Sequence, residues 1–241
     1  MRTLGIVAHS IEGASLCFVT ACREAGRRLG PFMHPDIVMS AVPMGLSIPH
    51  WKSGEHSAVG RHLTKGVNMV AAAGADFFVC PDNTAHIVLE QIAGTLPIPG
   101  LHIAEVVCAA IAERGFTRIG LLGTKWTMTG PVYERALQSR GMVYLTPDEA
   151  VQDRINTAIF DELCHGRVTA ETTHLFLRAI DGLKSRGAEC VILGCTEIPL
   201  VVTAQNSPLP PMDSTRLLAR SAVERCLDES PLDVRNGWLA L

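Results

Sequence analysis

The chain contains two similar stretches, residues 75–86 and 188–199, and any fold proposed for it has to accommodate both. The first reads ADFFVCPDNTAH and the second AECVILGCTEIP. Each starts with an alanine and an acidic residue after a glycine, continues through a short apolar segment and ends in small polar residues. Apolar segments of this length are typical of buried strands in a parallel sheet. The repetition predicts two equivalent strands of an α/β fold.

Polar side chains stand at the end of both predicted strands. Asp82, Asn83 and Thr84 follow the first, whereas Cys195, Thr196 and Glu197 follow the second. Ligands of open α/β sheets bind just beyond the carboxyl ends of the strands. The two clusters therefore predict a site for a small molecule between Asp82 and Cys195.

The composition limits the class of protein. The chain has 241 residues, of which 47% are hydrophobic, and a net charge of -3. This suits one large domain or two small lobes, and the near-balanced charge indicates no nucleic-acid or membrane partner. No apolar run is long enough to cross a bilayer and no secretory signal is evident, so a cytoplasmic location is expected. The eight cysteines include no Cys-x-x-Cys pair, which argues against a structural zinc site.

The rest of the chain alternates predicted strands and helices. We expect further strands at 3–7, 36–40 and 118–123, helices at 57–73, 103–114, 147–163 and 168–185, and a last helix ending near Asp228. The tail after Ser230 is expected to be peripheral. No strand is followed by a phosphate-binding loop, which argues against NAD and ATP.

Three motifs resemble those of the aspartate/glutamate racemase family. They are Asn83-Thr84-Ala85-His86, Leu121-Leu122-Gly123-Thr124 and Gly194-Cys195-Thr196-Glu197-Ile198. The resemblance covers nearly the whole chain. It implies two similar α/β lobes with mostly parallel sheets and an active site in the cleft between them. The first lobe would comprise residues 1–100 joined by a C-terminal helical segment, 212–241, and the second residues 101–211.

The resemblance also implies an activity. Members of this family use no cofactor, and one cysteine from each lobe acts as acid or base on the α-carbon of an amino acid. A homodimer is implied as well. In this chain Asp82 stands where the first catalytic cysteine is expected, so the predicted catalytic pair is Asp82 and Cys195. Cys80, two residues earlier, is expected to be a small buried residue.

Several other residues are candidates for substrate binding. Asn83, Thr84 and Thr196 are suited to donate hydrogen bonds where negative charge collects on the substrate. The family has a substrate-contacting turn at the position of His9 and Ser10, although His9 is alternatively a solvated turn residue. Thr124 and Thr127 are helix caps, carboxylate ligands or both. The remaining candidates are Arg167, which is alternatively a surface residue, and Glu197, whereas the family implies that His86 is structural.

The segment 41–52 follows the second predicted strand and is mostly apolar. It could cover the site and exclude water, or it could be a surface loop packed by Leu46, Ile48 and Trp51. Its apolar character hints at a substrate with a less acidic side chain.

The predicted catalytic pair is chemically unequal. Aspartate normally titrates near ~3.9 and cysteine near ~8.5, so the reverse protonation state lies on the order of 6 kcal/mol above carboxylate plus thiol. Burial is expected to raise the pKa of Asp82, and a helix N-terminus to lower that of Cys195, which would narrow this gap. If the free-energy difference between the two protonation states stays this large, the site would favour one enantiomer as substrate or another reaction through the same carbanion.

The sequence therefore predicts a cofactor-independent amino-acid racemase or epimerase, an isomerase acting on a small carboxylate or amino acid. Two alternatives stay open at this point. One is a decarboxylase of a substituted malonate, which needs only one cysteine. The other is an amino-acid-binding protein that lost turnover with the first cysteine.

Overall fold

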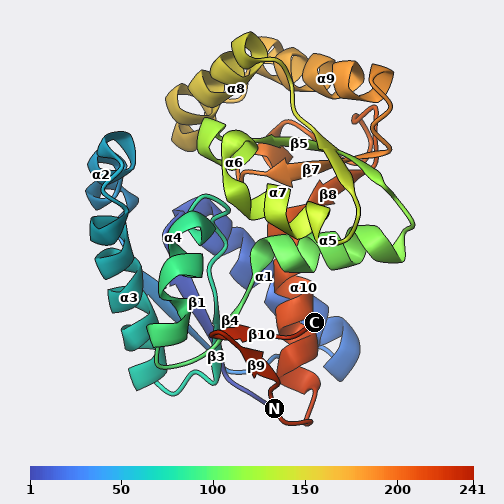
Figure 1. Ribbon diagram of the computed structural model, residues 1–241. Helices are drawn as coiled ribbons and strands as arrows, with labels where there is room; N and C mark the ends of the chain where they lie inside the picture. Colours follow the sequence, from blue (N-terminus) through green and yellow to red (C-terminus); the bar gives the residue numbers. More distant parts are fainter. The chain divides into compact units, whose positions relative to one another are not determined.

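The computed structural model describes all residues, 1–241, and divides them into two compact units (Figure 1). The first unit comprises Met1–Val106 and Thr215–Leu241, and the second comprises Val107–Ser214. Each unit has its own mostly parallel sheet with helices around it. The predicted α/β class is confirmed. None of the helices is long and apolar enough to cross a membrane.

The sheet of the first unit has six strands. In order they are β2 (Ile37–Ala41), β1 (Leu4–Ala8), β3 (Phe77–Val79), β4 (Gly100–Leu101), β10 (Trp238–Leu239) and β9 (Val234–Arg235). Every neighbouring pair is parallel except β10 and β9. The predicted strands at 3–7 and 36–40 correspond to β1 and β2. Because β1 lies between β2 and β3, the residues that follow β1 and β3 emerge at the same edge of the sheet.

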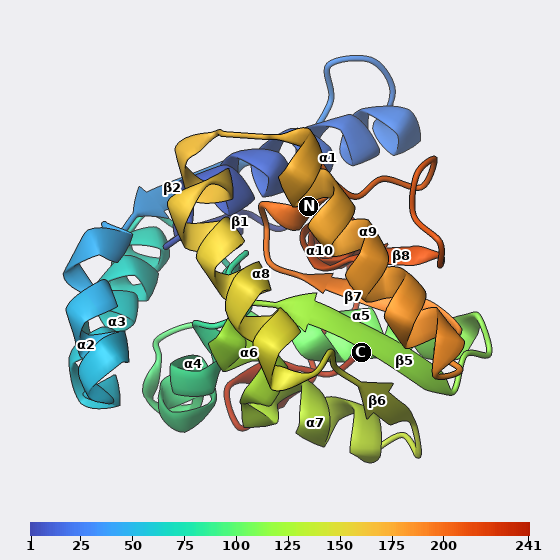
Figure 2. The same cartoon turned by 90° about the horizontal axis from the view of Figure 1, so that it is seen from above.

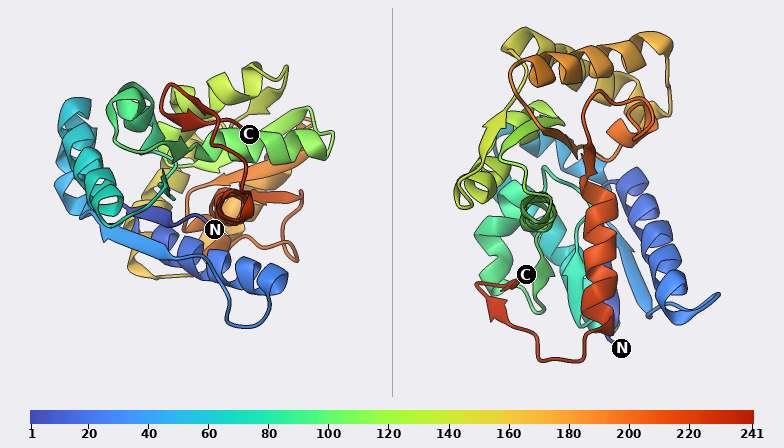
Figure 3. Two further views of the ribbon diagram at one scale, coloured as in Figure 1. Left: turned by 90° about the horizontal axis from the view of Figure 1, so that it is seen from below. Right: turned by 90° about the vertical axis from the view of Figure 1, so that its right-hand side faces the viewer.

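Alternate residues of β1 face different helices, as the period of a strand requires. Leu4, Ile6 and Ala8 join a buried core with α1 (Ile11–Leu29) and α10 (Ser214–Leu227). Figure 3 shows α10 running beside the sheet of the first unit. The opposite face of β1 meets α3 (His56–Ala72). There a Cβ atom on Gly5 would lie 2.9 Å from Cγ2 of Val70, so a glycine is needed for α3 to pack this closely.

The segment after β2 is more ordered than the sequence predicted. It forms a short 3-10 helix, η1 (Met44–Leu46), and α2 (Ile48–Ser53). Trp51 is buried, as a packed segment requires, but Leu46 is 56% exposed and does not contribute to packing. The first unit also contains α4 (His86–Ile92) and a 3-10 helix, η2 (Ala93–Thr95).

The expectation that the tail after Ser230 is peripheral is wrong. After α10 ends at Leu227, the chain forms the hairpin β9–β10, and β10 pairs with β4 in the central sheet. Trp238 of β10 packs against the rings of Phe78, His86 and His102. Burial of the indole ring against β4 offsets the entropy that is lost when the tail becomes ordered.

The sheet of the second unit has four parallel strands. In order they are β6 (Val143–Leu145), β5 (Arg118–Gly123), β7 (Cys190–Gly194) and β8 (Pro211–Asp213). The helices are α5 (Ile103–Glu113), which begins in the first unit, α6 (Lys125–Thr129), α7 (Pro131–Gln138), α8 (Glu149–Asp161) and α9 (Ala170–Ser185), with 3-10 helices η3 (Leu163–His165) and η4 (Ile198–Leu200). Figure 2 shows α9 along β5, where Leu183 occupies the space beside Gly120.

Candidate active site

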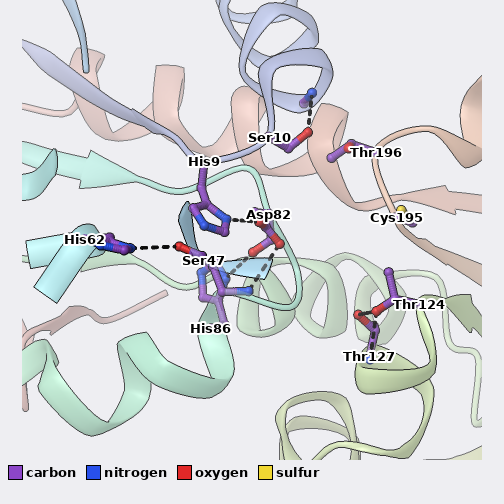
Figure 4. Close-up of polar contacts among 12 residues, drawn as sticks. His9, Ser10, Ser47, His62, Asp82, His86, Thr124, Thr127, Cys195 and Thr196 are labelled. Atoms are coloured by element: carbon purple, nitrogen blue, oxygen red, sulfur yellow. Dashed lines mark hydrogen bonds and ion pairs between the residues drawn. The ribbon is translucent and has the colours of Figure 1, made fainter. Parts of the chain in front are cut away.

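A histidine and a carboxylate meet at the edge of the first unit's sheet. His9 directly follows β1 and Asp82 lies three residues beyond β3, the neighbouring strand. Nδ1 of His9 and Oδ2 of Asp82 are 2.6 Å apart (Figure 4). The side chain of His9 is 1% exposed and that of Asp82 is 12% exposed. The pair is therefore a short, largely buried hydrogen bond between two titratable groups.

Asp82 is held by further contacts. Its Oδ1 accepts a hydrogen bond from the backbone N–H of Ala85 at 3.2 Å. Burial acts to raise the pKa of Asp82, but the hydrogen bond and charge of His9 and the Ala85 N–H outweigh it, and the pKa is lowered. The expectation that Asp82 has a raised pKa is therefore wrong, because a buried carboxylate that accepts hydrogen bonds is stabilised in its charged form.

His9 is not a solvated turn residue. Its ring is buried, and its Nδ1 contacts Asp82, which the sequence analysis did not predict. The other ring nitrogen, Nε2, is buried and has no hydrogen-bond partner. The signal that could have revealed the pairing is positional, since both residues follow strands that are neighbours in a parallel sheet.

The neighbouring candidates of the first unit are also buried. Ser10 is the N-cap of α1, where its hydroxyl accepts the N–H of Gly13 at 3.1 Å. Asn83 and Thr84 lie in the turn between Asp82 and α4 and are 3% and 9% exposed. A role for these three residues in substrate binding stays a prediction.

His86 is a structural residue by its contacts. Its Nδ1 lies 2.9 Å from the carbonyl oxygen of Asp82, and its Nε2 accepts the N–H of Ile103 at 3.3 Å. Both nitrogens of a neutral ring are thus used. Burial, then the charge of His102, lower the pKa of His86 to about 3. The neutral ring fixes the backbone at Asp82.

Cys80 is fully buried, as predicted for a small core residue. Burial first, then the negative charge of Asp82, raise the pKa of its thiol well above the usual value. A thiol of this kind is a poor base.

The second unit places Cys195 directly after β7, in a turn with Thr196 and Glu197. The thiol of Cys195 donates to Oε2 of Glu197 at 2.8 Å, and the hydroxyl of Thr196 donates to the same oxygen at 2.8 Å. Thr196 and Glu197 are 6% and 3% exposed. The three candidates from this motif therefore form one connected group.

The prediction that a helix N-terminus lowers the pKa of Cys195 is wrong. Only the three residues of η4 follow the motif, so no helix of useful length points at the thiol. Burial first, then the charge and hydrogen bond of Glu197, raise the pKa of Cys195 well above the usual value. The pKa values of Asp82 and Cys195 therefore differ by more than those of the free side chains. The stable forms are the carboxylate of Asp82 and the thiol of Cys195.

The remaining candidates of the second unit, Thr124, Thr127 and Arg167, form hydrogen bonds with residues close to them in the chain. Thr124 is the N-cap of α6, with its hydroxyl accepting the N–H of Thr127 at 3.2 Å. This is the capping interpretation, and a contact of either hydroxyl with substrate stays a prediction. Arg167 is exposed, and its guanidinium donates to the carbonyl oxygen of Asp161. The surface interpretation of Arg167 agrees with these contacts.

The eight cysteines form no disulfide. His, Cys, Asp and Glu side chains form no group of three that could hold a metal ion. The imidazole, carboxylate and thiol described above are groups that can transfer protons and form hydrogen bonds.

The chain is built of two α/β units, each with titratable side chains after strands of its parallel sheet. A model of the Asp/Glu/Hydantoin racemase family matches residues 11–222. The chain belongs to this family, which confirms the resemblance found in the sequence.

Individual relatives agree with this assignment. The broad specificity amino-acid racemase RacX of Bacillus subtilis is 28% identical over 176 residues, which are 72% of this chain and 74% of that protein. A putative Asp/Glu racemase from Yersinia pestis has a similar structure, with a TM-score of 0.86 and 29% identity over 95% of this chain and 100% of that one. An aspartate racemase homologue from Pyrococcus horikoshii, 24% identical with a TM-score of 0.81 over 95% and 100% of the chains, shares the fold.

Proposed function

We propose that this protein is a cofactor-independent amino-acid racemase, an isomerase that removes and returns the proton on the α-carbon. The observation that carries the proposal is that a family match over 11–222 coincides with proton-transfer groups directly after strands of both units. An amino acid's α-proton is weakly acidic, so its removal needs a base on one face, an acid on the other and donors around the carboxylate.

Cys195 would serve one face of the α-carbon, and Asp82 with its partner His9 the other. The proposal is supported by the protonation states that the contacts favour. The raised pKa of the Cys195 thiol keeps it protonated at rest, and the lowered pKa of Asp82 keeps its carboxylate ionised at rest. The resting enzyme would therefore be prepared for transfer in one direction.

The unequal stability of the two protonation states would affect the kinetics of racemisation. The two enantiomers of an amino acid with one stereocentre have equal free energies in water, so kcat/KM has to be the same in both directions. A site that favours one protonation state will show its preference as unequal kcat values with matching changes in KM.

The substrate class is a small amino acid. Asn83, Thr84 and Thr196 would donate to the carboxylate, with Ser10, Thr124, Thr127 and Glu197 around it. The relative from Bacillus subtilis is described as having broad specificity, which favours a screen over a single substrate. The segment 41–52 is mostly apolar and supports side chains less acidic than aspartate.

The test is deuterium uptake in D₂O, followed by proton NMR on both enantiomers of the common amino acids. A racemase places deuterium at the α-carbon and interconverts the enantiomers. Cys195→Ala should remove both activities, with Cys190→Ala, a buried cysteine of β7, as the matched control. If no amino acid exchanges, or if Cys195→Ala retains full turnover, the proposal is wrong. The comparisons name racemases and do not favour the decarboxylase or the binding protein.

We also infer a homodimer, on the basis of the family resemblance. Sedimentation equilibrium at micromolar concentration measures the assembly state directly. A mass equal to one chain of 25.9 kDa would contradict the dimer.

A further inference from the structure

The outermost strands of the two sheets differ in how well their open edges are protected. β9 is two residues long, and β6 and β8 are three residues long. β2 (Ile37–Ala41) is five residues long and contains neither a charged residue nor a proline. Native proteins protect a strand edge with charges, prolines, bulges or short strands, because an open edge can pair with another strand. β2 has none of these protections.

Every second residue of β2 directs its backbone polar groups away from β1. The N–H of Leu4 donates to the carbonyl oxygen of Asp36, and the N–H of Val42 donates to that of Ala8, each at 2.9 Å. With the register of the two strands, this directs the even-numbered residues 36–42 to β1. The outward N–H and C=O groups belong to the remaining residues, Ile37, Met39 and Ala41. No strand lies on that side, and β2 is the blue arrow at the outer edge of the first unit in Figure 3.

Exposed apolar side chains surround this edge. Met39 shares the face of Ile37, which packs against the core containing α1, and Met39 itself is exposed. On the other face, Sδ of the exposed Met69 lies 3.5 Å from Oγ of Ser40. Phe32, in the turn before β2, is 99% exposed and has a φ of 66°, which is unfavourable for a residue with a side chain. Apolar surface gathered around an open edge is typical of a protein interaction site.

We propose that β2 binds β2 of a second copy of this chain, antiparallel and with a two-fold axis at Met39. Met39 then faces Met39 of the second copy, and Ile37 faces Ala41. The sheets of the two first units become one continuous sheet. The inference goes beyond the racemase function and rests on the homodimer inferred above, to which it assigns a surface.

A second copy fits this edge because the strand is complementary to itself. In an antiparallel pair, residues that exchange both hydrogen bonds alternate with residues that exchange none. About an axis at Met39, the residues that exchange bonds are Ile37, Met39 and Ala41, the same ones that have outward groups. Each outward N–H therefore meets an outward C=O. A register shifted by one residue would place them opposite residues whose groups point to β1.

The segments at the two ends of β2 are also complementary in this orientation. Antiparallel pairing brings the turn before one β2 to the segment after the other, η1 (Met44–Leu46). The first carries the exposed Phe32 and the second the exposed Leu46. Two apolar side chains that have no packing partner within the chain are thus brought to the same end of the interface, where each can shield the other from water.

Charged residues favour the same pairing. Asp36 directly precedes β2, and antiparallel pairing brings it to the end of the other strand, opposite Val42. Lys65 of α3 lies at that end, since a Cβ atom on its neighbour Gly66 would be 2.8 Å from Cγ2 of Val42. Asp36 and Lys65 are exposed and have no ion pair within the chain. Opposite charges therefore approach each other at both ends of the interface, which favours this partner and orientation.

The experiment compares the dimer dissociation constants of the wild type, Met39→Lys and Met39→Pro by analytical ultracentrifugation. Met39→Lys places like charges opposite each other at the axis, and Met39→Pro removes the outward N–H without removing a bond to β1. Each should weaken the dimer roughly tenfold or more. Circular dichroism checks that the variants are folded. The matched control is Val143→Lys, an exposed residue of the edge strand β6, which should associate as the wild type does.

A cysteine at the axis tests the register without weakening the interface. Directly opposite, hydrogen-bonded residues have Cα atoms about 5.5 Å apart, within the range of a disulfide. Oxidation should therefore link two copies of Met39→Cys, as seen on a non-reducing gel. Ile37→Cys should not link to itself, because those positions lie about 13 Å apart along the strand, but it should link to Ala41→Cys. The wild type, oxidised in the same way, gives the background from the native thiols.

Three results would overturn the inference. They are a wild-type mass of one chain at every concentration, unchanged dimer affinity in folded Met39→Lys and Met39→Pro, and a disulfide in Ile37→Cys but none in Met39→Cys. Deuterium exchange tests the racemase function separately. A monomeric wild type that exchanges the α-proton would overturn the interface alone. A wild type that dimerises through β2 and exchanges no amino acid would overturn the racemase function alone.

Discussion

The thiol of Cys195 and the carboxylate of Glu197 are joined by a 2.8 Å hydrogen bond within a single turn. The same carboxylate oxygen accepts the hydroxyl of Thr196, which fixes its position. The charge and hydrogen bond of Glu197 beside the thiol oppose ionisation of Cys195. This local arrangement explains why Cys195 rests as a proton donor.

Glu197→Gln should make the Cys195 thiol more reactive. The substitution removes the charge and hydrogen bond that, after burial, raise the pKa of Cys195, so the thiolate fraction at pH 8 increases. Since each unit of pKa changes that fraction about tenfold, alkylation of Cys195 by iodoacetamide should accelerate severalfold or more. Peptide mass spectrometry assigns the rate to Cys195 among the eight thiols.

The control for this measurement is Glu171→Gln, an exposed residue in the first turn of α9. It should leave the alkylation rate of Cys195 at the wild-type value. An equal or slower rate in Glu197→Gln would show that Glu197 does not raise the pKa of the thiol.

His86 should make the protein less stable in acid. Its pKa is lowered from 6.5 to about 3, first by burial, so between these values the unfolded chain binds a proton that the folded chain does not. The stabilising contribution is fully present above pH 6.5 and is lost as the pH falls toward 3. It changes by about 1.4 kcal/mol per pH unit within that window.

The measurement is the free energy of urea unfolding of the wild type and His86→Gln from pH 7 to pH 3.5. The variant should be less stable at pH 7, and the difference should shrink as the pH falls. Other carboxylates and histidines contribute to both proteins and cancel in the comparison. Parallel pH curves for the two proteins would mean that His86 takes up a proton in the folded state.

Trp238→Ala should destabilise the first unit. The indole stacks on His86 with centroids 5.7 Å apart and also meets His102 at 4.6 Å, so it supports the ring that fixes Asp82. Because Trp238 is partly exposed, we expect a loss of about 2 kcal/mol, which is less than the roughly 3–5 kcal/mol typical of truncating a fully buried tryptophan. Trp238→Phe should recover much of it in thermal and urea unfolding.

Val234→Ala provides the matched control in the same hairpin. Val234 lies in β9 and is 46% exposed, so its truncation should change the stability by less than about 0.5 kcal/mol. Equal effects of Trp238→Ala and Val234→Ala would indicate that the hairpin contributes nothing through its indole.

Thr124→Ala should cost about 1 kcal/mol of stability through loss of the cap of α6. Thr124→Ser keeps the hydroxyl that accepts the N–H of Thr127 and removes only the methyl group. The free energies of urea unfolding of the two variants distinguish the contribution of the capping hydrogen bond from that of the methyl group's packing. If both lose the same free energy, the methyl group rather than the hydroxyl is responsible.

Much of the fold could be predicted from local sequence. Short apolar runs and helical periodicity predicted the strands β1, β2, β3, β5 and β7 and the helices α3, α5, α8, α9 and α10 within a few residues. The C-terminal hairpin could not be predicted in this way. Trp238 and Leu239 form too short a strand to be recognised, and their partner β4 lies more than a hundred residues earlier in the chain.

The sequence by itself determined the α/β class, the family and the positions of Asp82 and Cys195, because strand patterns and motifs depend on neighbours along the chain. Only the tertiary structure decided how these groups are protonated. His9 reaches Asp82 across two adjacent strands, and Glu197 reaches Cys195 through the shape of one turn. Both contacts shift a pKa opposite to the expectation from burial or helix position alone, since electrostatic effects depend on distance in space and on the solvent that folding removes.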